Sequence, residues 1–549
     1  MRKNLIVLFI LFAFLVPQSA LAFSKDEENK AVVTITKAER RMAEAITADR
    51  LKSYLSYIAS DAMAGRDTPS PGLDATAQFI ALHLKLWGFK PAGDDGTFFQ
   101  KMYVKKESLV SADLNVGGSK FKYGDDYVKL SGDVIPSAPL VFVRDGWMVK
   151  SKGIDAYEGV DVKDKLVVVY SEQPSRGIAP PRPEGVTDED VAGEKGVEWA
   201  DPASYAEMKG AKGIVVVMSP AIEQRWAGIK GFFMGGDAGI EGLERNSRIG
   251  APNLPTLLVS SKVAKAMFGG DKDHKSDKSF ETGKNASFKM VTNLERIPTQ
   301  NVVAIWEGSD PVLKEEMVAI GAHYDHVGTN ENARGDDKIW NGADDDGSGT
   351  VGVLSVAEAL KSSPVRPRRS VLFVWHAGEE KGLWGSEYFN KYPTVDIKKV
   401  VAQLNIDMIG RSRAKDDKNS KNKDLTGPNE VYVIGSEMMS TTLGAVTRET
   451  NAGYMNMSYN LKYDDPKDTN RFFFRSDHFN YAVNGIPIVF WFTGVHEDYH
   501  QPGDEVEKID FQKMEKIVRT IFLTAWELTA LDARPLVDKA LPPELSRRN

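Results

Sequence analysis

The chain contains no cysteine among its 549 residues. This absence excludes disulfides, thiolate metal sites, a catalytic thiol and a cysteine that accepts a lipid anchor. Long basic stripes are also absent, and the formal net charge of −7 at pH 7 argues against nucleic acid as a partner. The remaining composition, 42% hydrophobic and 27% charged, is that of a globular protein long enough for two or three domains.

The start of the chain has the pattern of a secretory signal. Arg2 and Lys3 precede an apolar run from Leu5 to Val16, which is shorter than the roughly 20 residues that span a bilayer. The run ends in Ser-Ala-Leu-Ala, which predicts a signal peptide over residues 1–22. We therefore expect an exported protein, periplasmic or extracellular, with no membrane span after cleavage. An uncleaved anchor is the alternative.

From residue 301 onward, apolar strands alternate with segments of helical periodicity. Strands are predicted at 302–306, 317–322, 370–376, 402–407, 431–434 and 486–492. Helices are predicted at 349–361, 382–391, 436–450 and 510–530. This alternation predicts the α/β class, with a mixed, mostly parallel sheet and helices on both of its faces. Residues 36–58 and 71–86 also show helical periodicity, with Asp49 as the expected cap of a helix in the first segment.

The pattern of apolar and turn-forming residues changes at about residue 136. Short apolar strands, such as Leu166–Tyr170 and Ile214–Met218, here alternate with turns that contain glycine and aspartate. Together with the family resemblance set out below, this change predicts a smaller β-rich domain inserted into the larger one. The expected organisation is a signal peptide at 1–22, an N-terminal part of the main domain at 23–135, the insert at 136–270, the rest of the main domain at 271–533 and a tail at 534–549.

Five residues with metal-binding side chains stand in distinct motifs of the last part of the chain. They are His323 in AHYDH, Asp345 in NGADDDGSG, Glu380 in WHAGEEKG, Asp407 in LNIDMIG and His500 in DYHQPGDE. Two imidazoles and three carboxylates can hold a pair of co-catalytic zinc ions, with one carboxylate as the bridge. The sequence therefore predicts one site with two metals.

The predicted strands place these residues at one edge of the sheet. His323, Glu380 and Asp407 each fall at or just after the carboxyl end of a predicted strand, where open α/β sheets carry their sites. Two adjacent carboxylates, Glu379 and Glu380, are costly at the end of an apolar strand unless a cation or proton offsets them. Asp325 is placed to hold the second ring nitrogen of His323. His326 is a competing ligand in the same loop.

Together these motifs resemble peptidase family M28. AHYDH, NGADDDGSG, GEEKGLWGSEYF, NIDMIG, RSDHF and YHQPGDE occur in the order and at the separations of that family of zinc peptidases. The resemblance implies a zinc exopeptidase fold with two zinc ions. It implies that Asp345 bridges them, that His323 and Asp407 complete one site, and that Glu380 and His500 complete the other.

The same resemblance implies roles beyond the ligands. Glu379 would be the general base and acid, and Asp325 would orient His323. Residues 136–270, with GVDVKDKLVVV and MKGAKGIVVV, resemble a protease-associated (PA) domain. Some family members carry an oxyanion-stabilising tyrosine shortly before the serine of the SDH motif. In this chain the preceding residues are Phe472, Phe473, Phe474 and Arg475, and none is a tyrosine. The donor would therefore have to come from Arg475, Ser476 or a tyrosine elsewhere. We predict that the three phenylalanines form a buried strand.

The resemblance favours an aminopeptidase that acts on the N-termini of peptides or proteins. A carboxypeptidase is the near alternative, with Arg411, Arg413 or Arg475 as the anchor for a substrate carboxylate. Two further alternatives use the same scaffold. One is a glutaminyl-cyclase-like acyltransferase, which normally has one zinc, and the other is a non-catalytic binding protein. Two positions are predicted for Trp384, which lies beside the two glutamates: one in the wall of a specificity pocket and one in the core. The sequence does not indicate the oligomeric state.

Overall fold

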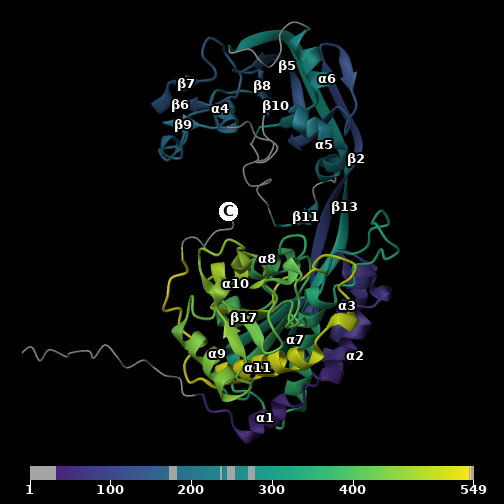
Figure 1. Ribbon diagram of the computed structural model, residues 1–549, viewed down its shortest axis with the longest axis vertical. Helices are drawn as coiled ribbons and strands as arrows, with labels where there is room; N and C mark the ends of the chain where they lie inside the picture. Colours follow the sequence, from purple (N-terminus) through teal and green to yellow (C-terminus); the bar gives the residue numbers. More distant parts are fainter. Residues whose placement is uncertain are drawn as a thin grey trace, which may run out of the picture.

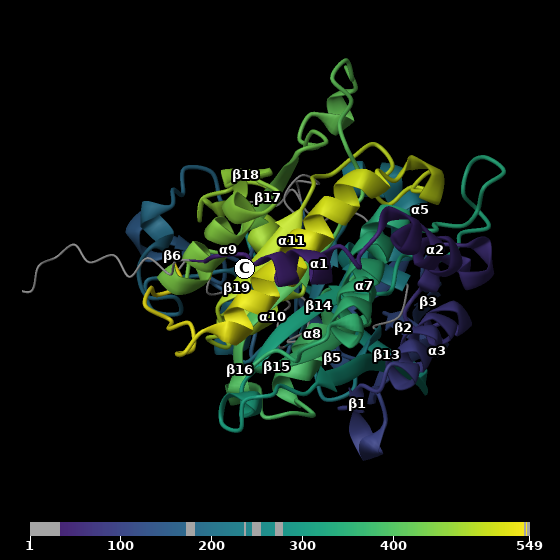
Figure 2. The ribbon, with the colours of Figure 1, turned by 90° about the horizontal axis from the view of Figure 1, so that it is seen from below.

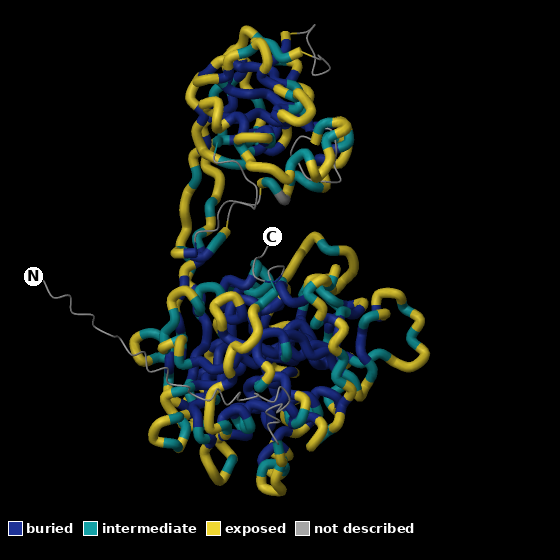
Figure 3. The backbone as a smooth tube through the Cα atoms, turned by 90° about the vertical axis from the view of Figure 1, so that its left-hand side faces the viewer, coloured by how far each residue is buried: buried dark blue, intermediate teal, exposed yellow. Residues whose placement is uncertain are grey.

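Two lobes make up the part of the chain that the computed structural model describes, residues 33–171, 182–234, 238–243, 254–269, 278–542 and 545. The predicted signal peptide lies outside these residues. Two long strands, β2 (Phe99–Val116) and β13 (Phe280–Trp306), run from one lobe to the other (Figure 1). They pair antiparallel from Val302↔Phe99 to Ala286↔Val116. Each lobe has its own buried interior, and the chain between them is more exposed (Figure 3).

The larger lobe is built on a mixed sheet. Its strand order is β18-β17-β19-β16-β14-β15-β13, with β14, β15, β16 and β19 parallel to their neighbours in this group and β13 antiparallel to β15. The strands of this lobe are β1 (Lys90–Pro91), β14 (Met317–His323), β15 (Ser370–His376), β16 (Val400–Ile406), β17 (Glu430–Ile434), β18 (Ser458–Asn460) and β19 (Ile488–Phe492). The predicted α/β fold with a mostly parallel sheet is confirmed.

Helices cover both faces of this sheet, which explains why its strands are apolar without alternation. In β14, Val318 belongs to the core on one face and Ala319 to the core on the other. Helices α7 and α11 lie across the first face (Figure 2), while α8 and α10 pack on the second. The helices of the lobe are α1 (Lys37–Ala43), α2 (Ala48–Ile58), α3 (Pro71–Leu86), α7 (Gly349–Ser362), α8 (Trp384–Lys391), α9 (Thr441–Gly453), α10 (His478–Val483) and α11 (Phe511–Ala530).

The smaller lobe continues the same sheet in the order β5-β8-β10-β12-β4. The first four strands are parallel, and β4 is antiparallel to β12. Its elements are β3 (Ser119–Phe121), β4 (Tyr127–Ser131), β5 (Val134–Phe142), β6 (Met148–Val149), β7 (Ile154–Asp155), β8 (Leu166–Tyr170), β9 (Trp199–Ala200), α4 (Pro202–Met208), β10 (Gly213–Val217), α5 (Pro220–Met234), β12 (Thr256–Val259) and α6 (Ser261–Phe268), while β11 (Ala238–Ile240) pairs with β2.

The core of the smaller lobe extends beyond the predicted insert of residues 136–270. It includes Leu114 and Tyr127 on one side and Phe288 on the other, because β2 and β13 each contribute to both lobes. The relation of this lobe to PA domains stays a prediction. The described part of the predicted tail lies on the larger lobe, where Leu545 is buried and Arg534 donates to the carbonyl of Val400. No helix among the described residues has the length and apolar character to cross a bilayer.

Two local predictions are wrong. Thr47 rather than Asp49 caps α2, because its side chain accepts the N–H of Arg50. Phe472–Phe474 form a buried 3₁₀ turn rather than a strand. Arg471, in the left-handed region at φ 55°, turns the chain just before them. The apolar side chains are buried in either shape, so hydrophobicity alone did not distinguish them.

We expect the variant Glu527→Gln to be more stable than the wild type at pH 8 but not at pH 5. Burial near the end of α11, with a smaller effect of Glu39, raises the pKa of Glu527 from 4.5 to about 7. The native state therefore binds a proton that the unfolded chain has released between these pH values, and its stability falls as the pH rises through them. Allowing for solvent screening, the difference is about 1 kcal/mol. Thermal unfolding at both pH values measures it, and an equal shift at both would contradict the assignment.

Candidate metal centre

One edge of the larger sheet gathers the predicted site residues. His323 is the last residue of β14, Glu379 and Glu380 follow β15, and Asp407 directly follows β16. Since these three strands are parallel neighbours, their carboxyl ends meet at the same edge. His500 comes from the loop after β19, the parallel neighbour of β16. The structure thus brings together all five residues predicted as ligands.

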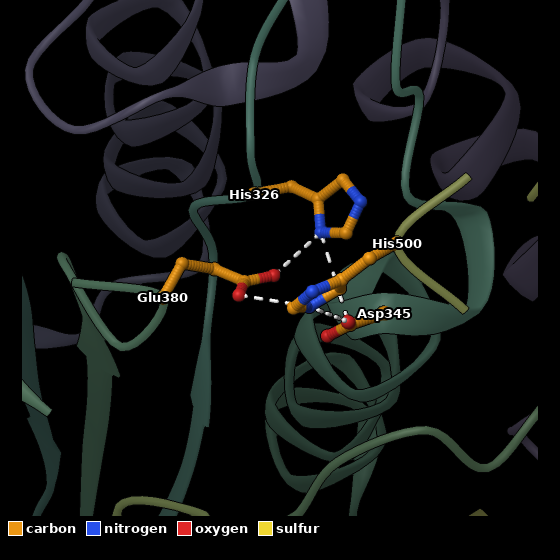
Figure 4. A group of neighbouring side chains, drawn as sticks. All are labelled: His326, Asp345, Glu380 and His500. Carbon is orange, nitrogen blue, oxygen red and sulfur yellow. Dashed lines mark ion pairs between the residues drawn. The ribbon is translucent and has the colours of Figure 1, made fainter. Parts of the chain in front are cut away.

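The first group of side chains comprises His326, Asp345, Glu380 and His500, which point toward one another in Figure 4. The Nε2 atom of His500 lies 2.9 Å from Glu380 Oε2 and 3.1 Å from Asp345 Oδ2. The Nδ1 atom of His326 lies 2.8 Å from Glu380 Oε1. These ligand atoms come from four separate loops, and all lie within 4.8 Å of one another.

A second group, on the other side of Asp345, comprises His323, Asp346 and Asp407. The Nε2 atom of His323 lies 3.7 Å from Asp407 Oδ2. Burial raises the pKa of Asp407, against the opposing effects of His323 and, to a smaller extent, of a contact with Ser476. Ser476, from the RSDHF motif, also accepts a hydrogen bond from the side chain of Asn405 at 2.8 Å. The motif therefore contacts the second group.

Asp345 stands between the two groups. Its Oδ1 lies 3.3 Å from His323 Nε2, and its Oδ2 lies 3.1 Å from His500 Nε2. One carboxylate oxygen thus faces each group, which is the arrangement that a bridging carboxylate requires. The ligand roles themselves stay predictions.

The three consecutive aspartates of NGADDDGSG have three different surroundings. Asp344 points away from the ligands, and its carboxylate accepts the N–H of Gly410 at 2.6 Å. Asp345 faces both groups. Asp346 uses Oδ1 to accept the N–H of Gly349 at 2.9 Å, at the start of α7, and leaves Oδ2 without a hydrogen-bond partner among the described residues.

Asp325 and Glu379 lie side by side behind His323. The Nδ1 atom of His323 lies 3.1 Å from the carbonyl oxygen of Asp325 and 3.5 Å from its Oδ1. The backbone N–H of Glu379 donates to Asp325 Oδ1 at 3.1 Å. Asp325 therefore lies at the second ring nitrogen of His323 and also ties the loop that carries Glu379, while its role in orienting the imidazole stays a prediction. This loop begins at Gly378, with φ 75°, where a Cβ atom would meet the side chain of Trp384.

A buried arginine, Arg66, holds two of the ligand loops together. Its guanidinium donates to the carbonyl of Tyr324 at 3.0 Å, of Asn341 at 2.7 Å and of Gly342 at 2.9 Å. These carbonyls flank His323 and the aspartate motif, so one side chain sets the separation of the two loops. Asp504 also fixes the aspartate motif, since its Oδ2 accepts the N–H of Asp344 and of Asp345 at 3.0 Å each.

Burial and mutual contact shift the pKa values of the cluster in opposite directions. Burial would raise the pKa of Asp345, but contacts with His323 and His500 hold it well below the usual value. Burial would lower the pKa of His500, but contacts with Asp345 and Glu380 raise it to about 10. Burial, with the charges of Glu380 and Asp407, raises the pKa of Glu379 well above its usual value. Within the protein alone, the carboxylates therefore exceed the positive charge that balances them.

The donor set fits cations. Asp345 Oδ2, Glu380 Oε1 and His500 Nε2 are buried and lie close together, yet each lacks an aligned hydrogen bond within the described residues. Polar atoms that point toward one another without forming hydrogen bonds have the arrangement of metal ligands. Imidazole and carboxylate ligands suit zinc, and a cation would offset the charge that the imidazoles leave unbalanced.

A small pocket opens beside the cluster. Its lining residues are Asp345, Glu379, Asp407, Met408, Phe472, Arg475, Phe490, Phe492, Val495 and Tyr499. Trp384 is not among them and is buried in the main core, which settles the two alternatives for this residue. The wall beside the carboxylates is mostly aromatic and apolar.

Four functional candidates were missed or left open by the sequence. His326 was an alternative to His323, whereas the structure places the two in separate groups. Asp346 gave no signal that separates it from its neighbours. Tyr499 directly precedes His500, and this adjacency could have revealed it. Arg66 lies far from the metal motifs in sequence, so only the fold shows its role.

Comparisons with known proteins relate part of the chain to a peptidase family. The model of peptidase family M28 matches residues 301–525. A probable leucine aminopeptidase of Arthroderma benhamiae (strain ATCC MYA-4681 / CBS 112371) is 29% identical over 226 residues, 40% of this chain and 56% of that protein. Leupeptin-inactivating enzyme 1 of Streptomyces exfoliatus is 25% identical over 314 residues, 53% of this chain and 62% of that protein. Both matches span less than two thirds of the relative.

Among solved structures, an aminopeptidase from Aneurinibacillus sp. strain AM-1 is similar with a TM-score of 0.49 and 16% identity. The similarity covers 92% of this chain and 98% of that one.

We expect Arg66→Lys to lower the affinity for zinc by about 10- to 100-fold, the range found when groups that orient metal ligands are lost. Lysine keeps the charge but lacks the planar fork that binds three carbonyls together. Competition with a fluorescent chelator measures the affinity, and circular dichroism establishes that the variant is folded. Arg50→Lys, on the exposed side of α2, is the control. A folded Arg66→Lys variant with wild-type affinity would contradict the role of Arg66.

Proposed function

We propose that this protein is a zinc-dependent exopeptidase, and specifically an aminopeptidase, because residues 301–525 match the model of peptidase family M28. The observation that carries the proposal is the position of Glu379. This carboxylate belongs to neither group of candidate ligands, yet it lies beside both and lines the pocket. The names of the matched relatives, a probable leucine aminopeptidase and leupeptin-inactivating enzyme 1, support a peptidase.

Two zinc ions are proposed for the two groups. His323 and Asp407 would hold one ion, Glu380 and His500 the other, and Asp345 would bridge them. When bound, zinc would supply Lewis acidity at the scissile carbonyl and lower the pKa of an attacking water. His326, 2.8 Å from Glu380, would orient this carboxylate or add a fourth ligand to its group.

Glu379 would move the protons. Its Oε2 lies 3.9 Å from His323 Nε2, and its side chain is 12% exposed, so it reaches the pocket while it stays largely shielded from solvent. Glu379 would accept a proton from the attacking water and deliver it to the nitrogen of the leaving group. The hydrogen bond from its own backbone N–H to Asp325 keeps the residue in place for both steps.

Tyr499 is the proposed donor to the oxyanion. Its ring stacks on that of His500, with 4.0 Å between the centroids, and Arg475 donates to its hydroxyl oxygen at 3.3 Å. Burial raises the pKa of Tyr499 above its usual value, so the hydroxyl keeps its proton at neutral pH. With its oxygen occupied as an acceptor, the O–H is free to donate to a substrate oxygen in the pocket.

Peptide N-termini are the proposed substrates, and export to the periplasm or the medium is the proposed localisation. Among the alternatives, a carboxypeptidase needs an anchor for a carboxylate. Arg411 is buried and bound to Asp498 at 2.8 Å, and Arg413 donates to backbone carbonyls of its own loop. Neither lines the pocket, so only Arg475 remains for that role.

We expect Glu379→Gln to retain wild-type zinc content and to lose about 10²- to 10⁴-fold in kcat, the usual contribution of general acid–base catalysis. The assay is hydrolysis of aminoacyl p-nitroanilides, with a chelator as the second test of metal dependence. Glu387→Gln, on the nearby α8, is the matched control that keeps its activity. Near-wild-type turnover in zinc-replete Glu379→Gln would refute the mechanism.

A further inference from the structure

Arg475 is the cation in the wall of the pocket. The other charged side chains that line the pocket are the carboxylates of Asp345, Glu379 and Asp407, which belong to the metal centre. The remaining lining residues are apolar or aromatic, apart from the hydroxyl of Tyr499. A substrate bound here therefore meets one positive side chain that the predicted chemistry does not use as a ligand or proton carrier.

The neighbours of Arg475 orient the guanidinium without neutralising it. Its Nη2 atom donates to Tyr499 at 3.3 Å, and its Cζ lies 4.9 Å from the centre of the Phe472 ring and 6.0 Å from that of Tyr499. No carboxylate among the described residues lies within ion-pair distance of Arg475, whereas the buried Arg369 and Arg411 each have one. Most of its five N–H donors therefore remain for a ligand.

A guanidinium held in this way is suited to a carboxylate. Its planar fork can bind both oxygens at once, and the aromatic rings beside it orient the guanidinium, while Arg475 itself stays exposed at the mouth of the pocket. The position also explains why Arg475 does not collapse onto the carboxylates of the metal centre. Its stacking on Phe472 and its hydrogen bond to Tyr499 keep it on the opposite part of the wall.

The geometry points to Arg475 as a specificity-determining residue that receives a carboxylate of the substrate. This inference rests on the proposed peptidase function. The carboxylate has two possible sources: an acidic side chain at the N-terminal residue, with its stem against the aromatic wall, or the C-terminal carboxylate of a short peptide. Both present the same chemistry to the guanidinium, and substrates can be chosen to separate them.

The test compares matched pairs of substrates that differ in one charge. The first pair is glutamyl and glutaminyl p-nitroanilide, which reports on a side-chain carboxylate. The second is leucyl-glycine and leucyl-glycinamide, which reports on a C-terminal carboxylate. For each pair, the ratio of kcat/KM for the acid to that for the amide is measured. This ratio cancels any general loss of activity.

We expect a ratio of at least ten for one pair in the wild type, which identifies the source of the carboxylate. Arg475→Met should lower this ratio at least tenfold, mainly through KM, because a group that does not react binds alike in ground and transition states. Arg475→Lys should retain part of the ratio. Arg471→Met is the control. Arg471 is exposed like Arg475 and also lies over an aromatic ring, with its Cζ 4.5 Å from the centre of the Phe474 ring, but it does not line the pocket.

Three results would overturn the inference. The first is a ratio near one for both pairs in the wild type. The second is an unchanged ratio in Arg475→Met. The third is an equal loss on the acid and the amide, which would mean that Arg475 only holds Tyr499 in place. If no neutral substrate is hydrolysed by the zinc-loaded wild type, the proposed function itself fails, and the inference with it.

Discussion

Repulsion among buried carboxylates is the constraint on which the larger lobe depends. Six of them lie within one small region at the edge of the sheet: Asp325, Asp345, Asp346, Glu379, Glu380 and Asp407. Among the described residues, three imidazoles and the guanidinium of Arg66 face them, so the protein alone leaves negative charge unbalanced, at a cost that rises steeply with burial. Two zinc ions would remove this imbalance. The metals would therefore stabilise the fold of the site as well as supply its chemistry.

Hydrogen bonds from two further buried residues hold the cluster in shape. Arg66 binds the carbonyls of both ligand loops, and Asp504 accepts two successive backbone N–H groups of the aspartate motif. The parallel strands fix the remaining positions, because neighbouring strands in register end at the same level. The pocket lies where this edge meets Arg475, just before α10, and Tyr499, in the loop after β19. Substrate choice would therefore depend on residues outside the metal centre.

Much of this arrangement could be predicted from the sequence. The apolar runs of β14, β15, β16 and β19 are long and bounded, and the motifs follow their ends, so both the sheet and the five candidate ligands were found. Local backbone geometry could be predicted less well. The chain direction at Phe472–Phe474 depends on the turn at Arg471, and the two roles of His323 and His326 depend on how one loop bends. The limits of the smaller lobe's core could not be read from the sequence, because β2 and β13 contribute to both lobes.

The number and place of the metal ions test the central claim most directly. Crystals of the mature protein grown with zinc, measured on both sides of the zinc absorption edge, would show each ion as an anomalous peak. The account predicts two peaks on either side of the Asp345 carboxylate, one beside His323 and Asp407 and the other beside Glu380 and His500. A single peak, or two peaks that do not share Asp345, would contradict it.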